Sequence, residues 1–142
     1  MTKGLLTAAI ISISCSTSVF AASCDDTRLL GYMHEIKDEI GSLSSDLKAG
    51  DNQSAAGHAS ALIGYFEKAR SETPYKFQEE NLKGDKLKQQ QAEYTKVVDD
   101  TIVILKDLEV ALKSNNAPEA KKLLGAIGGQ RKIGHSSFKA NC

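Results

Sequence analysis

Apolar residues recur at steps of three and four along four separate segments of this 142-residue chain, and strict alternation of apolar and polar residues is almost absent. Such spacing places the apolar side chains on one face of an α-helix. The first segment shows the pattern most clearly, with Met33, Ile36, Ile40, Leu43 and Leu47 as its apolar positions. The pattern therefore predicts an all-α fold.

Residues that end or begin helices separate the four segments. The turn sequence AGDN at 49–52 ends the first helix and supplies an Asp or Asn to begin the second. The second helix should end before Thr73 and Pro74, because the residue before a proline disfavours the helical conformation. The sequence NAPE at 116–119 begins the fourth helix, with asparagine as the cap and proline in the first turn.

The other three apolar faces follow the same spacing. The second helix contributes Ala55, Ala59, Leu62, Phe66 and Ala69. The third contributes Leu87, Tyr94, Val97, Thr101, Ile104, Leu108 and either Ala111 or Leu112. The fourth includes two polar residues and consists of Leu124, Ile127, Arg131, His135 and Phe138.

Four amphipathic helices with short connections bury their apolar faces best as an up-down-up-down antiparallel four-helix bundle. In this topology the first helix starts at the end of the bundle where the fourth helix finishes. We therefore expect Met33 and His135 to lie at the same end of the bundle.

The first twenty or so residues follow a different pattern. Lys3 precedes an apolar run, and small residues follow it, with Val19 and Ala21 at the two positions that define a signal-peptidase site. We expect residues 1–21 to be a signal peptide and residues 22–142 to form one exported domain, in the periplasm. The apolar run is too short to span a bilayer, and nothing after it resembles a second span.

The cysteines fit an exported protein. Removal of the signal peptide would take Cys15 away and leave Cys24 and Cys142 near the two termini. In an oxidising compartment such a pair is most simply explained as a disulfide, which requires the termini to meet. Lipidation of Cys15 or Cys24 ranks below secretion, because neither has a large aliphatic residue three places before it.

Composition and motifs narrow the function. The 18 basic and 18 acidic residues balance, and no basic stripe indicates a nucleic acid partner. No nucleophile elbow, phosphate loop, zinc spacing or pair of di-iron Glu-x-x-His motifs occurs, so we do not expect an enzyme. Tryptophan is absent and aromatic residues are few, so the core must come from aliphatic side chains or from a group that is not protein.

A methionine and a histidine that face one another in a helical bundle are axial ligands typical of an electron-transfer haem. Met33 and His135 are the candidates, and the absence of a CxxCH motif means that any haem is bound without covalent bonds, as a b-type haem. Each residue also has an ordinary explanation, with Met33 as core filler and His135 as a solvated side chain. His34 and His58 lie off the apolar faces, and we interpret both as surface histidines.

Glycines interrupt the fourth helix at positions 125, 128, 129 and 134. Each costs about 0.5–1 kcal/mol relative to alanine in a helix interior. A large flat group lying against the helix backbone would explain why they are tolerated, and a poorly formed helix end is the alternative.

These residues together resemble the cytochrome b562 family of soluble periplasmic b-type cytochromes. The resemblance rests on the signal peptide, on Met33, and on the sequences ARSETPYKF, ALKSNNAPEAKKL and RKIGHSSF. It implies one non-covalent haem b per chain, bound by Met33 and His135. It also implies that Arg131 lies near the haem edge, where its charge could pair with a propionate or raise the reduction potential. Val97 and Thr101 stand where the best-known member of the family has two phenylalanines that pack on the haem.

We therefore expect a monomeric periplasmic protein that exchanges single electrons with redox partners not yet identified. No nucleic acid partner and no membrane span in the mature chain are expected. Two alternatives share the fold: an interaction bundle without haem, and a haem carrier or sensor that uses the same site.

Overall fold

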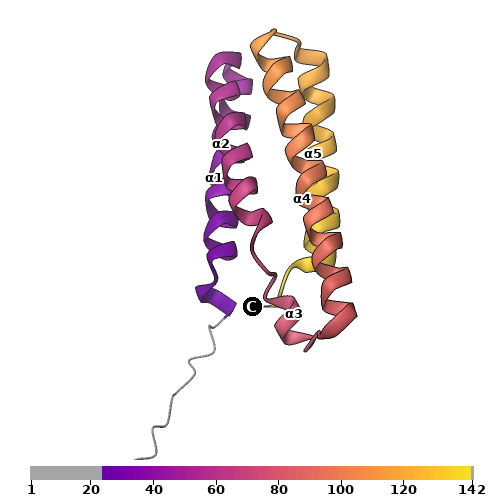
Figure 1. Ribbon diagram of the computed structural model, residues 1–142. Helices are drawn as coiled ribbons and strands as arrows, with labels where there is room; N and C mark the ends of the chain where they lie inside the picture. The colour runs from indigo at the N-terminus through magenta and orange to yellow at the C-terminus, as the bar shows by residue number, and fades with distance from the viewer. Residues whose placement is uncertain (1–23, 142) are drawn as a thin grey trace, which may run out of the picture.

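The computed structural model describes residues 24–141, and all regular secondary structure within this range is helical. A short 3₁₀ helix η1 (Cys24–Asp26) precedes five α-helices: α1 (Arg28–Ala49), α2 (Asn52–Arg70), α3 (Lys76–Glu79), α4 (Gly84–Lys113) and α5 (Ala117–Phe138). The four long helices lie side by side, with the short α3 at the end where the C-terminal residues also lie (Figure 1). The expected signal peptide and Cys142 fall outside the described residues.

Side-chain caps mark where three of the four long helices begin, namely α1, α2 and α5. Thr27 Oγ1 accepts a hydrogen bond from the Leu30 N–H at 3.2 Å, and an Asp51 carboxylate oxygen accepts one from the Ser54 N–H at 2.9 Å. The Asn116 side chain caps α5 in the same way. These contacts satisfy N–H groups that have no partner within the helix. The helix starts predicted at 49–52 and 116–119 are thus confirmed.

Gly50 ends α1 with a φ of 77°, in the left-handed region. Glycine adopts this conformation without the steric cost that a side chain would add. Its N–H lies 3.1 Å from the Leu47 carbonyl, and the Asp51 N–H lies 2.9 Å from the Asp46 carbonyl. The chain therefore reverses between α1 and α2 within a few residues.

The main core lies among the four long helices. α1 packs on α2, α2 on α4, and α4 on α5. Four leucines at its centre are at most 1% exposed: Leu43, Leu62, Leu105 and Leu108. Three predicted apolar residues of α1 are only half-buried and pack against this core from its edge: Met33, Ile40 and Leu47.

A second, smaller core closes the end of the bundle at α3. Phe77 of α3 and Tyr94 of α4 each contact Phe138 edge to face, with ring centroids 6.0 and 5.5 Å away. The Tyr94 hydroxyl donates a hydrogen bond to the Ala69 carbonyl at 2.7 Å. The sequence predicted only a break at Thr73–Pro74 here, because a four-residue helix is too short to produce a periodic pattern.

The buried face of α4 is wider than the sequence pattern predicted. Tyr94, Thr101 and Leu108 are buried as predicted, but Val97 and Ile104 are only half-buried. Three positions outside the predicted face are buried as well: Val98, Ile102 and Leu105. The reason is that α4 packs against both α2 and α5, so it buries two adjoining flanks.

Candidate functional site

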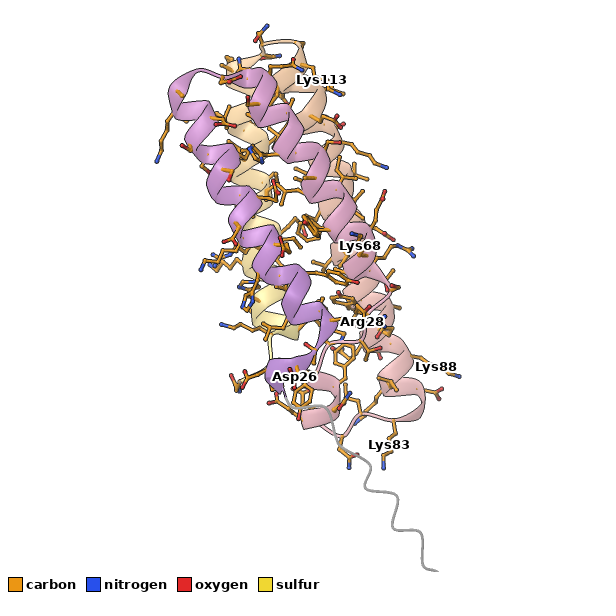
Figure 2. The ribbon with its side chains drawn as sticks, turned by 90° about the vertical axis from the view of Figure 1, so that its left-hand side faces the viewer. Asp26, Arg28, Lys68, Lys83, Lys88 and Lys113 are labelled. Carbon is orange, nitrogen blue, oxygen red and sulfur yellow. The ribbon has the colours of Figure 1, made fainter. Side chains whose placement is uncertain are left out.

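The helices α1 and α5 occupy neighbouring corners of the bundle but hardly approach each other (Figures 1 and 2). The other three neighbouring pairs of long helices pack closely along their length. We call the line between α1 and α5, flanked by Met33 and Ile40 on α1 and by Leu124 and His135 on α5, the α1/α5 seam. This seam is the one side of the bundle that the protein's own backbone packing leaves open within residues 24–141.

Met33 lies on the flank of α1 that faces away from α2. The opposite flank holds Glu39, whose carboxylate contacts His58 Nδ1 of α2 at 2.6 Å. Asp46 on that flank contacts the other nitrogen of the same ring at 3.3 Å. Because successive helical residues are turned by about 100°, Met33 is about 120° around α1 from Glu39 and about 60° from buried Ile36. The thioether side chain is thus half-buried at the edge of the core beside the seam.

His135 and Arg131 lie on one flank of α5 and are both exposed. The face of α5 that packs into the bundle consists of Ala120, Leu123, Ile127 and Phe138. Arg131 is turned by about 40° and His135 by about 80° from Ile127 around the helix. The sequence placed all of these polar residues on the same face as Ile127 and Phe138. In the structure they border that face, together with half-buried Leu124.

The imidazole of His135 is suited to binding a metal. Partial burial of the ring lowers its pKa, and the positive charges of Arg131 and Lys139 lower the pKa further. A lower pKa favours the neutral ring at neutral pH, and the neutral imidazole is the form that ligates metals.

None of the four glycines in α5 is required by packing within the described part of the chain. A Cβ atom added at Gly125, Gly128 or Gly129 would meet nothing within 4 Å, and one at Gly134 would meet only Val97 Cγ1 at 3.7 Å. Gly128 is turned by about 100° from Ile127, on the His135 side of α5. The seam side of α5 is therefore bare backbone between Leu124 and Arg131.

Val97 and Thr101 are two small side chains one turn apart on α4. Thr101 is 4% exposed, and its hydroxyl donates to the Val97 carbonyl at 2.7 Å. The hydroxyl is thus satisfied within its own helix, and the methyl group is left for packing. These residues present less apolar surface than two phenylalanines would.

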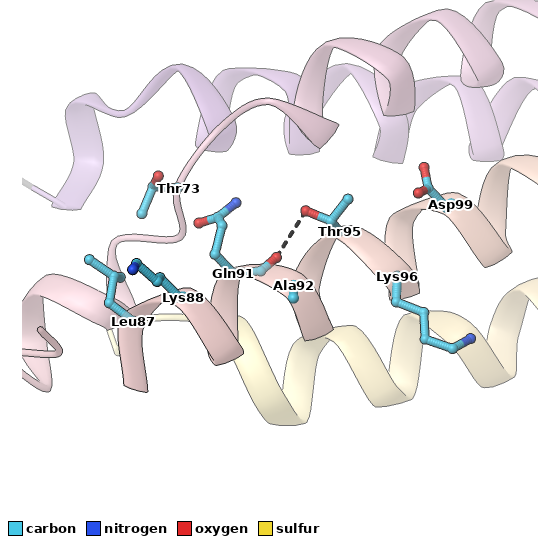
Figure 3. Close-up of a pocket in the computed structure, with 8 residues that line it drawn as sticks. All are labelled: Thr73, Leu87, Lys88, Gln91, Ala92, Thr95, Lys96 and Asp99. Atoms are coloured by element: carbon cyan, nitrogen blue, oxygen red, sulfur yellow. Dashed lines mark hydrogen bonds between the residues drawn. The ribbon is translucent and has the colours of Figure 1, made fainter. Parts of the chain in front are cut away.

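Two cavities of the described structure lie away from these residues. The larger, about 680 Å³, runs along α4 beside Thr73 and is lined by Leu87, Gln91, Ala92 and Asp99 among others (Figure 3). The second, about 520 Å³, lies near α3 and has mostly charged and amide side chains in its wall. Met33, Arg131 and His135 do not line either of these two cavities.

Sequence analysis missed one residue that positions the site. Phe77 packs on Phe138, which lies three residues after His135, and so fixes the last turn of α5. An isolated aromatic residue just after the break at Pro74 was the available signal. Among the described residues no group of three or more His, Cys, Asp or Glu side chains could hold a metal ion.

A bundle of four long helices is the fold of several classes of small protein, haem-binding cytochromes among them. The family model for Cytochrome b562 matches residues 29–139, and the chain belongs to the cytochrome b562 family. This is a family of haem-binding electron carriers, b-type and typically periplasmic, and it is not an enzyme family. No curated protein and no solved structure matches the chain in the corresponding searches. No helix within residues 24–141 has the length and apolar character needed to cross a bilayer.

Proposed function

We propose that the protein is a periplasmic electron carrier that binds one non-covalent haem b in the α1/α5 seam, with Met33 and His135 as axial ligands. The observation that supports this most strongly is the open seam between α1 and α5, with these two residues on its borders. The proposed fold is the antiparallel four-helix bundle in up-down-up-down order.

The positions along the helices support the pairing of Met33 with His135. Met33 is five residues after the start of α1, and His135 is three residues before the end of α5. At 1.5 Å per residue, these positions are about 7.5 and 4.5 Å from the same end of the bundle. The two side chains would therefore sit at nearly the same height.

Helix handedness supports the same pairing. In Figure 1, α1 rises from η1, whereas α5 descends toward α3 beside it. With these directions, right-handed helices turn the flank opposite Glu39 toward α5 and the Arg131 flank toward α1. Both proposed ligands would thus point into the seam from opposite sides.

The donor set fits a haem that carries electrons. Haem supplies an iron that changes oxidation state by one electron, and a thioether and a neutral imidazole are the axial ligands of many such haems. Met33 would hold the iron from a half-buried position, and His135 would hold it with a neutral ring. With both axial positions filled by the protein, no position is left for a substrate.

Arg131 is the charged neighbour of the proposed site. It lies one turn before His135, is exposed, and forms no ion pair with any residue in 24–141. A guanidinium here is free to pair with a propionate, and its charge favours the reduced, less positive iron.

Export and the terminal disulfide belong to the same proposal. We propose that residues 1–21 direct export, that residues 22–142 form one domain, and that Cys24 bonds to Cys142. Cys24 lies in η1, next to the start of α1, and the backbone N–H of Asn141 contacts Glu79 Oε2 of α3 at 3.4 Å. The two ends of the described chain therefore lie at the same end of the bundle.

The variant Met33→Ala tests the ligand assignment. We expect five-coordinate or water-ligated iron, a shift from low-spin toward high-spin absorption, and a lower reduction potential. Ile40→Ala is the matched control, because it shortens a half-buried side chain on the same flank of α1 and removes no ligand. Unchanged spectra in Met33→Ala would contradict the assignment.

The haem-free interaction bundle remains the second candidate. Val97 and Thr101 favour this candidate, because they offer little apolar surface to a haem and the Thr101 hydroxyl already donates to the Val97 carbonyl. Purified protein that stays colourless when haemin is added would support this candidate. Coloured protein that yields haem rapidly to apomyoglobin would instead support a haem carrier or sensor.

A further inference from the structure

The balanced total charge hides an uneven distribution along the chain. Residues 120–142 contain no acidic residue and five basic ones: Lys121, Lys122, Arg131, Lys132 and Lys139. Lys122 contacts Glu119 at 3.2 Å. The other four are exposed, and none forms an ion pair within the described part of the chain. The charged residues of α5 that follow Glu119 are therefore all cations.

The charges of α1 are sorted between its two flanks. Glu35, Glu39 and Asp46 lie on the α2 side, where they contact Tyr65 and His58. Lys37 lies on the other side, about 40° beyond Met33 around the helix. Lys48 is within about 20° of Lys37, so it faces the same way. Both lysines are exposed and lack an ion pair among residues 24–141.

Arg131 borders the α1/α5 seam, and five lysines lie beside the seam on the outward flanks of the two helices. Lys121 and Lys139 are about 80° and Lys132 about 100° past Arg131 around α5. We call the surface formed by these six cations the basic face: Lys37, Lys48, Lys121, Arg131, Lys132 and Lys139. No acidic residue of α1 or α5 lies on it by helical spacing. The nearest acidic residue on α1 is Asp38, about 100° past Lys37 and toward the outer side of the helix. Asp26 of η1 lies at the lower end of the bundle in Figure 2, and Asp25 precedes it in the same short helix.

We propose that the basic face is the docking surface for an acidic redox partner protein, one with a carboxylate-rich patch around its own electron-transfer site. The proposal rests on the proposed function, because the basic face surrounds the seam through which electrons would pass. Complementary charge raises the rate of encounter and orients two proteins without requiring high affinity. Two haem propionates would neutralise part of the charge and leave an excess of cations.

The surface fits a protein better than a membrane. Lys121 and Lys139 are 18 residues apart, so the cations are spread over about 27 Å of helix length. The large exposed apolar residues are Val103, Val110 and Ile133. Ile133 is about 160° around α5 from Arg131, and the two valines are on α4. The basic face therefore offers no apolar side chain of this kind for insertion into lipid.

The probe is poly-L-glutamate, titrated into isotopically labelled mature protein as purified and followed by backbone amide NMR. At about 10 mM ionic strength, where charges act over about 30 Å, we expect shifts confined to the basic face. Affinity should fall by about tenfold or more at about 200 mM salt. Shifts spread equally over all exposed lysines would overturn the proposal.

Two sets of variants sharpen the test. Lys37→Gln, Lys132→Gln and Lys139→Gln combined should weaken binding by about tenfold. The matched control combines Lys83→Gln, Lys86→Gln and Lys88→Gln, at and just before the start of α4, and should change binding by less than about twofold. Figure 2 shows Lys83 and Lys88 on the side of the bundle away from α5. Equal binding by the first set and the wild type would refute the docking surface.

Two further results separate the possible failures. If phosphatidylglycerol vesicles bind as tightly as poly-L-glutamate and the first set weakens both, the face binds membranes, and the proposal is overturned. If colourless protein binds poly-L-glutamate at the basic face, the face still binds acidic proteins, but the electron-carrier proposal falls and the redox nature of the partner falls with it. If red, low-spin protein does not bind poly-L-glutamate, the electron-carrier proposal stands and the docking-surface proposal falls.

Discussion

The Tyr94 hydroxyl joins α4 to the end of α2 through a buried hydrogen bond. It donates to the Ala69 carbonyl at 2.7 Å from a side chain that is 5% exposed. Burial, with the negative charge of Glu72 nearby, raises the pKa of the phenol well above its usual value, so the hydroxyl stays protonated and keeps donating. The sequence placed Tyr94 on an apolar face but gave no indication of this hydrogen bond.

Replacing the tyrosine tests this bond. Tyr94→Phe should lower the free energy of unfolding by about 0.5–1.5 kcal/mol, because the variant loses this hydrogen bond while the Ala69 carbonyl keeps the one from the Glu72 N–H at 3.0 Å. Urea unfolding at neutral pH measures the change. Tyr75→Phe, a half-buried tyrosine with no hydrogen bond to its hydroxyl among the described residues, is the control and should be nearly neutral. Equal effects in the two variants would contradict the role of Tyr94.

A second prediction at the scale of single residues concerns how the stability contributed by Asp99 depends on pH. Hydrogen bonds from Arg70 lower the pKa of Asp99, with Nη2 to Oδ2 at 3.0 Å. Since the folded pKa is below the unfolded value of about 3.9, the stabilisation is present above that value. It is lost as pH falls through the lower folded pKa. Asp99→Asn should therefore be less stable than the wild type at pH 7 and equally stable at about pH 2 in urea unfolding. A stability difference that persists undiminished in acid would show that the carboxylate charge is not responsible.

Among the helices, α5 illustrates what periodicity can and cannot predict. The spacing of Ile127 and Phe138 identified a helix with a buried face, and both residues are buried. The same spacing could not show that Arg131 and His135 border that face, because a step of four residues advances about 40° around the helix and the drift accumulates. The caps at Asp51 and Asn116 were predictable, since they depend on neighbours in sequence.

The last turn of α5 is anchored by one side chain. Phe138 packs against Phe77 and Tyr94 and is 8% exposed. Phe138→Ala should cost about 3–5 kcal/mol of unfolding free energy and should weaken haem binding, because His135 lies in the turn that it anchors. Ile133→Ala, at a position 49% exposed, should change neither quantity appreciably and serves as the control. Chemical unfolding and haemin titration measure the two effects.

At the scale of the whole molecule, the proposed disulfide ties the two termini together. A bond from Cys24 to Cys142 would close a loop of more than a hundred residues and contribute at most about 4–5 kcal/mol by the chain-entropy model. Cys24→Ser combined with Cys142→Ser should lower stability by up to that amount and leave the helical content unchanged. Thiol titration of the denatured mature protein without reductant should find no free thiol, whereas two free thiols would refute the bond.

The four main helices and their order could be predicted from the sequence, because apolar period and caps are local signals. Two features of the whole molecule could not. The open α1/α5 seam depends on which helices pack, and the basic face depends on how Glu39 and Lys37 are turned to opposite flanks of α1. Counting charges along the chain gave a balance of 18 to 18 and concealed that face.

The absorption spectrum of the exported protein, oxidised and then reduced, tests the central claim most directly. The Met33 and His135 assignment predicts red protein with a low-spin, six-coordinate spectrum in both oxidation states and one haem per chain. Protein that is colourless after haemin is added, or that shows a high-spin, five-coordinate iron, would contradict it.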